Sequence, residues 1–293
     1  KKNQNFPKKM KKIYVIGSNG FIGKNFVEVS NNLSLNYIGI NREKIDLSKK
    51  IISKDLKKYI KKNSVLILLA FKTKHIDKKP SIIDNIDLTM NLAKIIELMK
   101  PSHVVLFSSM SVFGDKKNYN NYDEGSLVSP DNEYGIAKVF SENILNSLKK
   151  ISKLNLTIVR IPRVFGKYDY AYNYGPTSFL HNIIRKKPLK IWGDGKEKKH
   201  FLYIKDLIRI IEMIIRRKII GTFIIVPKKS YSFKQLALKC INLTNSKSRI
   251  ISKKRIYNGS NHLAKNNKIM KGLKKFRFTP IDKAIKEYYN ELK

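Results

Sequence analysis

The chain has 293 residues, 42% of them hydrophobic and 10% aromatic, which allows one large domain or two modest ones with a buried core and excludes a disordered or fibrous chain. Its longest uninterrupted apolar run, residues 65–71, is too short for a membrane-spanning helix of about 20 residues, and its single cysteine, Cys240, excludes an intrachain disulfide and fits a reducing, cytoplasmic setting. The formal net charge of +39 comes mainly from lysines scattered along a chain poor in Arg and Ala, as A/T-rich codons would produce. We therefore interpret the charge as a solvated basic surface, with steering of an anionic partner as the alternative, and we expect no nucleic-acid site.

Strand and helix patterns alternate along the first half of the chain. Residues 1–9 are polar and rich in Lys and predict a flexible leader. Short apolar runs predict strands at 12–17, 37–40, 65–71, 104–107 and 156–161. Helical patterns between them predict helices at 21–30, 51–61, 81–99 and 132–148, and the inward positions of the third helix are Ile82, Ile83, Ile86, Leu92, Ile95 and Ile96. This alternation implies a parallel sheet covered on both faces.

The pattern loosens after residue 165. Residues 166–176 are rich in Tyr, Asn and Gly and predict a loop. The elements expected beyond it are helices at 178–185, 205–217, 233–240 and 280–292 and strands at 189–192 and 222–226. Residues 4–12 and 251–271 are polar and basic enough to predict loops or mobile segments. We therefore expect one α/β domain over 10–165 and a smaller α/β part over 166–293, with an approximate boundary that the chain crosses again.

A glycine-rich turn separates the first predicted strand from the first predicted helix. Residues 17–23, GSNGFIG, have the spacing G-x-x-G-x-x-G. Gly17 permits a tight turn, Gly20 lets the backbone approach a pyrophosphate, and Gly23 lets the helix pack closely on the strand. The helix N-terminus then offers free N–H groups and the positive end of its dipole. The sequence therefore predicts a dinucleotide-binding, Rossmann-type doubly wound α/β domain over residues 10–165.

The end of the second predicted strand bears on the choice of dinucleotide. An Asp or Glu there would bind the ribose hydroxyls of NAD, but the sequence continues with Asn41 and Arg42. Arg42 instead favours the 2′-phosphate of NADP, with stacking on adenine or exposure to solvent as the alternatives. Asp46 and Leu47 follow closely and are candidates for contact with the adenine edge.

Tyr134 and Lys138 begin a predicted helix at the spacing i, i+4, which places both side chains on one face. A phenol with its ordinary pKa near 10 is a poor base at neutral pH, and a neighbouring ammonium lowers that pKa by stabilising the phenolate. Tyr134 can then exchange a proton with a sugar hydroxyl or ketone, and Lys138 can also hold a nicotinamide ribose. The preceding strand ends in serines, of which Ser109 can hydrogen-bond the reacting oxygen.

Several further segments follow one another along the chain in an order that resembles that of a known family. They are NIDLTMNL at 85–92, SSMSVFG at 108–114, YGIAK at 134–138, VRIPRVFGK at 159–167, IWGDGKEKKHFLYIKDL at 191–207 and the last helix with its lead-in. With the glycine loop, they resemble the extended short-chain dehydrogenase/reductase family, in its NAD-dependent epimerase/dehydratase branch acting on nucleotide sugars. The resemblance covers nearly all of residues 11–293. It implies a cytoplasmic enzyme of activated-sugar, surface-polysaccharide synthesis that forms a homodimer through two helices, one of them the Tyr134 helix.

The resemblance also implies roles for individual residues, with Ser109, Tyr134 and Lys138 as the catalytic set. The implied cofactor contacts are Gly17, Asn19, Gly20, Phe21, Ile22, Gly23, Asn41, Arg42, Asp46, Leu47, Leu69, Ala70, Phe71, Asn85, Tyr134, Lys138 and Ile161. The implied nucleotide-sugar contacts are Ser109, Met110, Ser111, Arg163, Lys199 and Tyr203. Lys199 stands where the family has a phosphate-clamping Arg, and Arg163 stands where many members have Asn. The loop 168–176 resembles a substrate loop, so its aromatic side chains are expected to flank a base or sugar, with ordinary loop packing as the alternative.

Departures from the family pattern narrow the chemistry. The acidic pair of the 4,6-dehydratases is replaced by Met110 and Ser111, so dehydration is not expected. The Cys acid of the 3,5-epimerising reductases is also absent, because Ser111 stands in its place. The segment Leu68-Leu69-Ala70-Phe71 stands where the family often has His-x-Ala-Ala. We therefore expect a 4-ketoreductase using NADP, with a 4-epimerase holding NAD as the alternative and a catalytically degenerate dinucleotide-binding protein as an alternative from another class. The histidines show no metal-ligand spacing, so no metal site is expected, and His200, in place of a family Asp, is expected to be structural.

Overall fold

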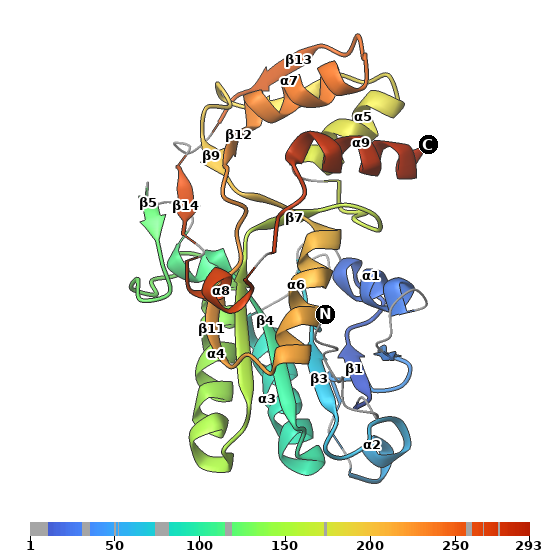
Figure 1. Ribbon diagram of the computed structural model, residues 1–293, viewed down its shortest axis with the longest axis vertical. Coiled ribbons are helices and arrows are strands. Elements are labelled where there is room, and N and C mark those ends of the chain that lie inside the picture. Colours follow the sequence, from blue (N-terminus) through green and yellow to red (C-terminus); the bar gives the residue numbers. More distant parts are fainter. Residues whose placement is uncertain are drawn as a thin grey trace, which may run out of the picture.

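A six-stranded parallel sheet forms the lower half of the molecule in Figure 1, a computed structural model that describes residues 11–30, 36–49, 51, 53–73, 82–114, 119–172, 175–255, 260–265, 267–274 and 276–293. Its strands are β1 (Ile13–Ile16), β2 (Tyr37–Ile40), β3 (Val65–Leu68), β4 (His103–Ser109), β6 (Leu156–Ile161) and β11 (Gly221–Ile224), in the order β11-β6-β4-β3-β1-β2. Every neighbouring pair is parallel. The strand order reverses at β1, because β2 lies on one side of it and β3 on the other. Ligands of such sheets bind at the carboxyl ends of the strands beside this switch point.

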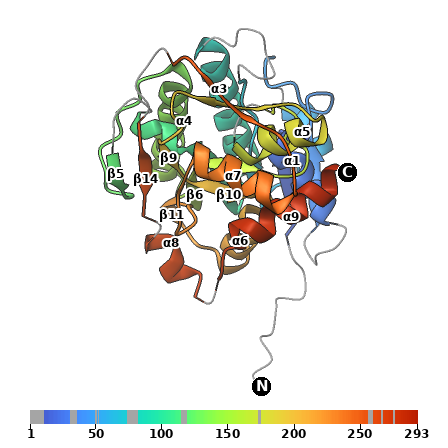
Figure 2. The ribbon, with the colours of Figure 1, turned by 90° about the horizontal axis from the view of Figure 1, so that it is seen from above.

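Helices cover both faces of the sheet because successive side chains of each strand point to opposite faces. Ile13 and Val15 pack with α1 (Phe21–Ser30) and α6 (Ile204–Arg217), whereas Tyr14 and Ile16 pack with α2 (Ser53–Tyr59), α3 (Ile82–Met99) and α4 (Glu133–Ser152). In Figure 2, α3 and α4 lie on one side of β6 and α6 lies on the other. The structure therefore confirms the predicted α/β class with a doubly wound parallel sheet.

The upper part of the molecule shares a core with the α1 and α6 face of the sheet. Its helices are α5 (Gly175–Ile184), α7 (Phe233–Leu243) and α9 (Ile281–Leu292). Short strands pair as β7 (Arg163–Phe165) with β10 (Phe201–Tyr203), β8 (Leu189–Trp192) with β13 (Ile250–Lys253), and β12 (Tyr231–Ser232), β9 (Lys198–Lys199), β14 (His262–Ala264) and β5 (Tyr119–Tyr122) in a sheet of that order. The remaining elements are the 3-10 helix η1 (Met110–Phe113) and α8 (Asn267–Gly272). This part stands above the carboxyl ends of the large sheet, so it encloses the switch point from above (Figure 1).

Three sequence expectations need correction or completion. The segment 251–271, expected to be loops, contains most of β13, all of β14 and most of α8. The third predicted strand ends at Leu68 rather than at residue 71, so residues 69–73 pass across the strand end instead of continuing it. Ile83, expected to face inward, is 63% exposed, because the buried face of α3 is formed by Asn85, Leu88, Leu92 and their helical neighbours. The predicted leader at 1–9 lies outside the described residues.

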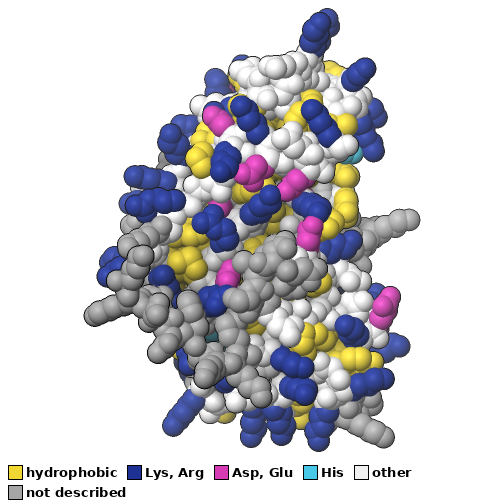
Figure 3. Space-filling model, turned by 45° about the vertical axis from the view of Figure 1, so that its right-hand side comes forward, with side chains coloured by type: hydrophobic (Ala, Val, Ile, Leu, Met, Phe, Trp, Pro, Cys, Tyr) yellow, Lys and Arg dark blue, Asp and Glu magenta, His cyan; other side chains and the backbone are white. Residues whose placement is uncertain are grey.

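Basic side chains are scattered over the face of the molecule that Figure 3 shows. Figure 3 shows Lys and Arg over the upper and the lower part of the visible face, with few Asp or Glu between them. Among the helices of the described residues, none combines the length and the apolar character that crossing a membrane requires.

Candidate functional site

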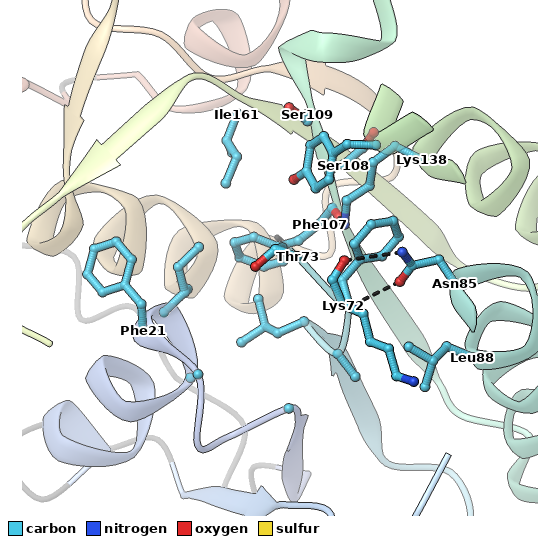
Figure 4. A pocket seen from close by; sticks show the side chains of 18 of the residues that line it. Phe21, Lys72, Thr73, Asn85, Leu88, Phe107, Ser108, Ser109, Lys138 and Ile161 are labelled. Atoms are coloured by element: carbon cyan, nitrogen blue, oxygen red, sulfur yellow. Dashed lines mark hydrogen bonds between the residues drawn. The ribbon is translucent and has the colours of Figure 1, made fainter. Parts of the chain in front are cut away.

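A cavity of about 870 Å³ lies at the carboxyl ends of β1, β3, β4 and β6, beneath the upper part. With the exception of Tyr203 and the described tyrosines of the loop 168–176, all residues predicted to contact a cofactor or substrate line it. In Figure 4, Phe21 approaches it from α1 and Lys138 approaches it from the opposite side, with Ser109 and Ile161 along one edge. The cavity therefore joins, in one continuous space, the glycine loop, the Tyr134 helix and two basic residues of the upper part, Arg163 and Lys199.

The glycine loop forms the floor of one end of the cavity. Gly17 has a φ of +95°, and a Cβ there would lie 2.6 Å from the backbone nitrogen of Ala70. A Cβ on Gly23 would lie 2.4 Å from the carbonyl oxygen of Gly17, so α1 packs against the loop more closely than any side chain allows. The two glycines bring the backbone and the start of α1 to the cavity wall, which is the cradle that a dinucleotide pyrophosphate fits.

The turn after β2 carries the residues predicted to meet the adenosine half. Arg42 has a side chain that is 72% exposed, and its Nε lies 3.4 Å from Asp46 Oδ1. Ser48 Oγ donates to the same carboxylate oxygen at 2.6 Å. The Ser48 hydrogen bond, with Arg42 contributing, lowers the pKa of Asp46, so the carboxylate stays ionised beside the guanidinium. The Arg42 guanidinium is therefore a largely exposed cation at the rim of the cavity.

Asn85, predicted to contact the cofactor, forms hydrogen bonds to the backbone of Lys72 through both the oxygen and the nitrogen of its amide. The Lys72 N–H donates to Asn85 Oδ1 at 2.8 Å, and Asn85 Nδ2 donates to the Lys72 carbonyl oxygen at 3.1 Å, as the dashed lines in Figure 4 mark. Asn85 is 5% exposed, and it borders the cavity. In this structure Asn85 therefore holds the backbone at Lys72, within the segment 69–73 that passes from β3 along the cavity.

Tyr134, Lys138 and Ser109 come together beside that segment. Asn132 caps α4 by accepting a hydrogen bond from Gly135 N at 2.9 Å, which places Tyr134 in the first turn with 36% exposure. Lys138 is buried one turn later, and its Nζ donates to the Phe107 carbonyl oxygen at 2.9 Å. Burial lowers the pKa of Lys138 to about 7 against the opposing effect of a nearby carboxylate. Ser109 Oγ accepts from Ser111 N at 3.1 Å at the start of η1, so the hydroxyl proton faces elsewhere.

A buried ion pair lies beneath these residues and was not foreseen from the sequence. Glu142 accepts Arg160 Nη2 at 2.7 Å and Arg160 Nε at 3.1 Å, and Ser108 Oγ donates to the same carboxylate at 2.5 Å. Glu142 and Arg160 are only 4% and 6% exposed. Glu142 is the carboxylate that raises the Lys138 pKa against the effect of burial. The Glu142 carboxylate, paired with the Arg160 guanidinium, therefore lies under the Tyr134–Lys138 face of α4.

The far end of the cavity is basic. Lys199 is buried and Arg163 is partly buried, and both line the cavity together with Asp169, His200 and His262. His200 Nε2 accepts from Ala264 N at 3.2 Å, and burial lowers the pKa of His200 to about 4, which fits the structural role expected for it. Two neighbouring cations suit a diphosphate, which Arg binds in a bidentate manner and Lys as a point charge.

Two groups of predicted substrate contacts are placed elsewhere. Tyr203 is buried in β10 outside the lining of the cavity, and its hydroxyl donates to Glu287 Oε2 at 3.2 Å. Within the loop after β7, Asp169 and Ala171 line the cavity, whereas the tyrosines of its described part turn to protein partners. Those tyrosines are Tyr168 and Tyr170 near Lys24 Nζ, and Tyr172, which stacks on His181 with 3.8 Å between ring centroids. In this structure these aromatics therefore show the alternative, ordinary loop packing, because alternate residues of the loop face opposite sides. In the parts of the chain that the structure describes, no group of three or more His, Cys, Asp or Glu could hold a metal.

Comparisons with known proteins agree with this layout. The model of the NAD dependent epimerase/dehydratase family matches residues 13–224. The UDP-2-acetamido-2,6-beta-L-arabino-hexul-4-ose reductase of Pseudomonas aeruginosa is 24% identical over 248 residues, which is 80% of this chain and 58% of that protein. The dTDP-D-glucose 4,6-dehydratase of Dictyostelium discoideum is 30% identical over 99 residues, which is 34% of this chain and 23% of that protein. The chain thus spans about half or less of the length of these curated relatives.

Solved structures share the fold at low sequence identity. The UDP-glucose 4-epimerase of Thermotoga maritima with UDP-glucose superposes with a TM-score of 0.84 at 17% identity and covers 96% of this chain and 98% of its own. The UDP-glucuronic acid 4-epimerase of Bacillus cereus in complex with UDP-glucuronic acid and NAD has a TM-score of 0.80 at 20% identity, with coverage of 96% and 100%.

Proposed function

The chain belongs to the NAD dependent epimerase/dehydratase family, and on that premise we propose that it is an NAD(P)-dependent enzyme acting on a ring carbon of a nucleotide sugar. The observation that carries this proposal is the single cavity that joins the glycine loop, the Tyr134–Lys138 pair and the basic end at Arg163 and Lys199. A dinucleotide on the loop and a diphosphate at the basic end would meet beside Tyr134. The specific reaction that we propose is reduction of a 4-keto group with NADPH.

The residues of the cavity divide the work of this reaction. A bound nicotinamide dinucleotide supplies the hydride. Tyr134 gives the proton to the sugar oxygen, and the Lys138 ammonium stabilises the phenolate that is left. The Ser109 hydroxyl hydrogen-bonds the same sugar oxygen and orients it. Arg163 and Lys199 neutralise the diphosphate and so hold the sugar at a fixed distance from Tyr134.

Arg42 supports NADPH rather than NADH as the cofactor. It lies on the rim of the cavity after β2, at the position where an acid would bind the ribose of NAD, and its guanidinium is exposed enough to reach a phosphate. We expect Arg42→Ala to weaken NADPH binding by about tenfold, the lower end for a charged hydrogen bond, and to leave NADH nearly unchanged. Titration calorimetry with both cofactors measures this, and Lys49→Ala, which removes an exposed charge outside the cavity lining, is the matched control. Equal losses for NADPH and NADH would contradict the assignment to the 2′-phosphate.

A 4-epimerase is the second candidate, and the fold similarity to two 4-epimerases favours it. Such an enzyme oxidises and reduces C4 in one cycle and therefore keeps its cofactor. The two readings separate when the protein, purified without added cofactor, is denatured and the released nucleotide is identified by mass spectrometry. Stoichiometric NAD would replace the reductase by the epimerase. An empty protein that then binds NADPH more tightly than NADH supports the reductase.

Two further points belong to the proposal. A catalytically degenerate protein would not need Ser109, Tyr134 and Lys138 together at one wall of the cavity, and their joint presence favours an enzyme.

A homodimer through α3 and α4 is supported by exposed apolar side chains on both helices, namely Ile83, Met90 and Ile136. Sedimentation of Met90→Glu against the unchanged protein tests that interface.

A further inference from the structure

Phe71 lies between the β3–α3 segment and the Tyr134 helix. Its ring centroid is 3.7 Å from Lys138 Nζ, so the ammonium lies against the aromatic face. The Tyr134 ring meets the Phe71 ring edge to face, with 5.3 Å between centroids and 82° between planes. One aromatic ring thus contacts both members of the proposed proton-transfer pair.

The backbone on both sides of Phe71 is fixed. Leu69 N and Ala70 N both donate to the Ile16 carbonyl oxygen, at 2.9 and 3.0 Å. On the other side, Asn85 holds Lys72 by its N–H and its carbonyl oxygen. The backbone from which the Phe71 ring projects is therefore held in place, and the hydrogen bonds of Asn85 contribute to this.

Lys138 is only 6% exposed, so its ammonium depends on contacts within the protein. Lys138 Nζ donates a hydrogen bond to the Phe107 carbonyl oxygen, and burial disfavours the charged form of the side chain. The ionisable groups that bear on it are Tyr134 and Glu142 from α4 and Arg160 from β6, and Arg160 neutralises much of the charge of Glu142. An aromatic face attracts an ammonium more strongly when both are desolvated.

We propose that Phe71 is a positioning residue for the Tyr134–Lys138 pair: its face keeps the Lys138 side chain cationic, and its edge-to-face contact keeps the Tyr134 ring beside it. Phe71 neither donates nor accepts a proton, and it acts through its contacts with Lys138 and Tyr134. The proposal rests on the proposed function only for its catalytic meaning, because the contacts among the three side chains exist without any ligand.

The test compares Phe71→Leu, which keeps apolar volume without an aromatic face, with Phe71→Tyr, which keeps the face. The Lys138 Nζ resonance is followed by NMR in ¹⁵N-lysine-labelled protein as the pH is raised, and a Lys138→Met sample assigns it. We expect Phe71→Leu to lower the pKa of Lys138 by about one pH unit and Phe71→Tyr to leave it within a few tenths. Phe71→Met serves as a second non-aromatic variant if the Leu variant is poorly folded, and Phe278→Leu, outside the cavity lining, controls for loss of a phenyl ring elsewhere.

Turnover adds a second readout of a different kind. Because activity needs charged Lys138, it is lost as the pH rises through the Lys138 pKa, so the alkaline limb of kcat/KM should move to lower pH in Phe71→Leu and return in Phe71→Tyr. A Lys138 pKa that is the same in the Leu, Tyr and unchanged proteins, or that moves equally in Phe278→Leu, would overturn the proposal. The titration uses no substrate, so a protein that shows the Lys138 shift but no turnover would refute the proposed function and leave this inference standing.

Discussion

Tyr134→Phe is expected to lower kcat by about a thousandfold, within the 10²- to 10⁴-fold range of a lost general acid. The variant removes one oxygen atom from a side chain at the cavity wall and leaves the ring contact with Phe71 in place. Its Kd for NADPH and its thermal stability should therefore stay close to those of the unchanged protein. Steady-state kinetics on a nucleotide 4-ketosugar and calorimetric titration with NADPH measure the two effects separately.

Tyr170→Phe is the matched control for the loss of a phenol. Tyr170 is 60% exposed and does not line the cavity, so the same substitution there should leave kcat unchanged. Near-normal turnover in Tyr134→Phe would remove Tyr134 from the proton route and with it the proposed role of Lys138.

Glu142→Gln is expected to destabilise the fold by about 3–5 kcal/mol, because it leaves the Arg160 guanidinium buried without its counter-charge. The variant also takes a negative charge from beneath Lys138, so the Lys138 pKa should fall further from its ordinary value. Urea unfolding measures the change in the free energy of unfolding. Asp282→Asn, which breaks a half-exposed ion pair with Lys239, should cost no more than about 1 kcal/mol in the same assay.

The double variant Glu142→Gln with Arg160→Met separates a buried-charge penalty from a general packing defect. Removal of both charges should recover most of the lost stability, since a buried ion pair is often replaceable by apolar groups of similar volume. A double variant no more stable than Glu142→Gln alone would show that the cost lies in packing rather than in the unpaired guanidinium.

Local signals in the sequence predicted the elements that build the cofactor end. The bounds of α1 and β2 and of β6 agree with the predicted ranges, because each run of apolar residues is closed by glycine or by polar residues next to it in the chain. The glycine loop could be placed for the same reason, since a strand, a tight turn and a helix follow one another within residues 13–30.

Long-range pairing explains what the sequence could not show. β9 and β14 are two and three residues long, and they form by pairing with each other and with β12 and β5, which no local pattern reveals. The Glu142–Arg160 pair likewise depends on the register of β4 and β6, which sets Ser108 opposite Arg160. The motif of Tyr203 gives its spacing from Lys199 but not the path of β10, which pairs with β7 and buries Tyr203 against Phe165.

The measurement that tests the account most directly is transfer of deuterium from NADPH labelled at the reactive C4 of its nicotinamide to a nucleotide 4-ketosugar. The product is analysed by mass spectrometry after incubation with the purified protein and with Tyr134→Phe. The account predicts one deuterium on the sugar ring with the unchanged protein and none above background with the variant. Unlabelled sugar in the presence of bound NADPH and 4-ketosugar would contradict the proposal that this cavity moves a hydride onto a nucleotide sugar.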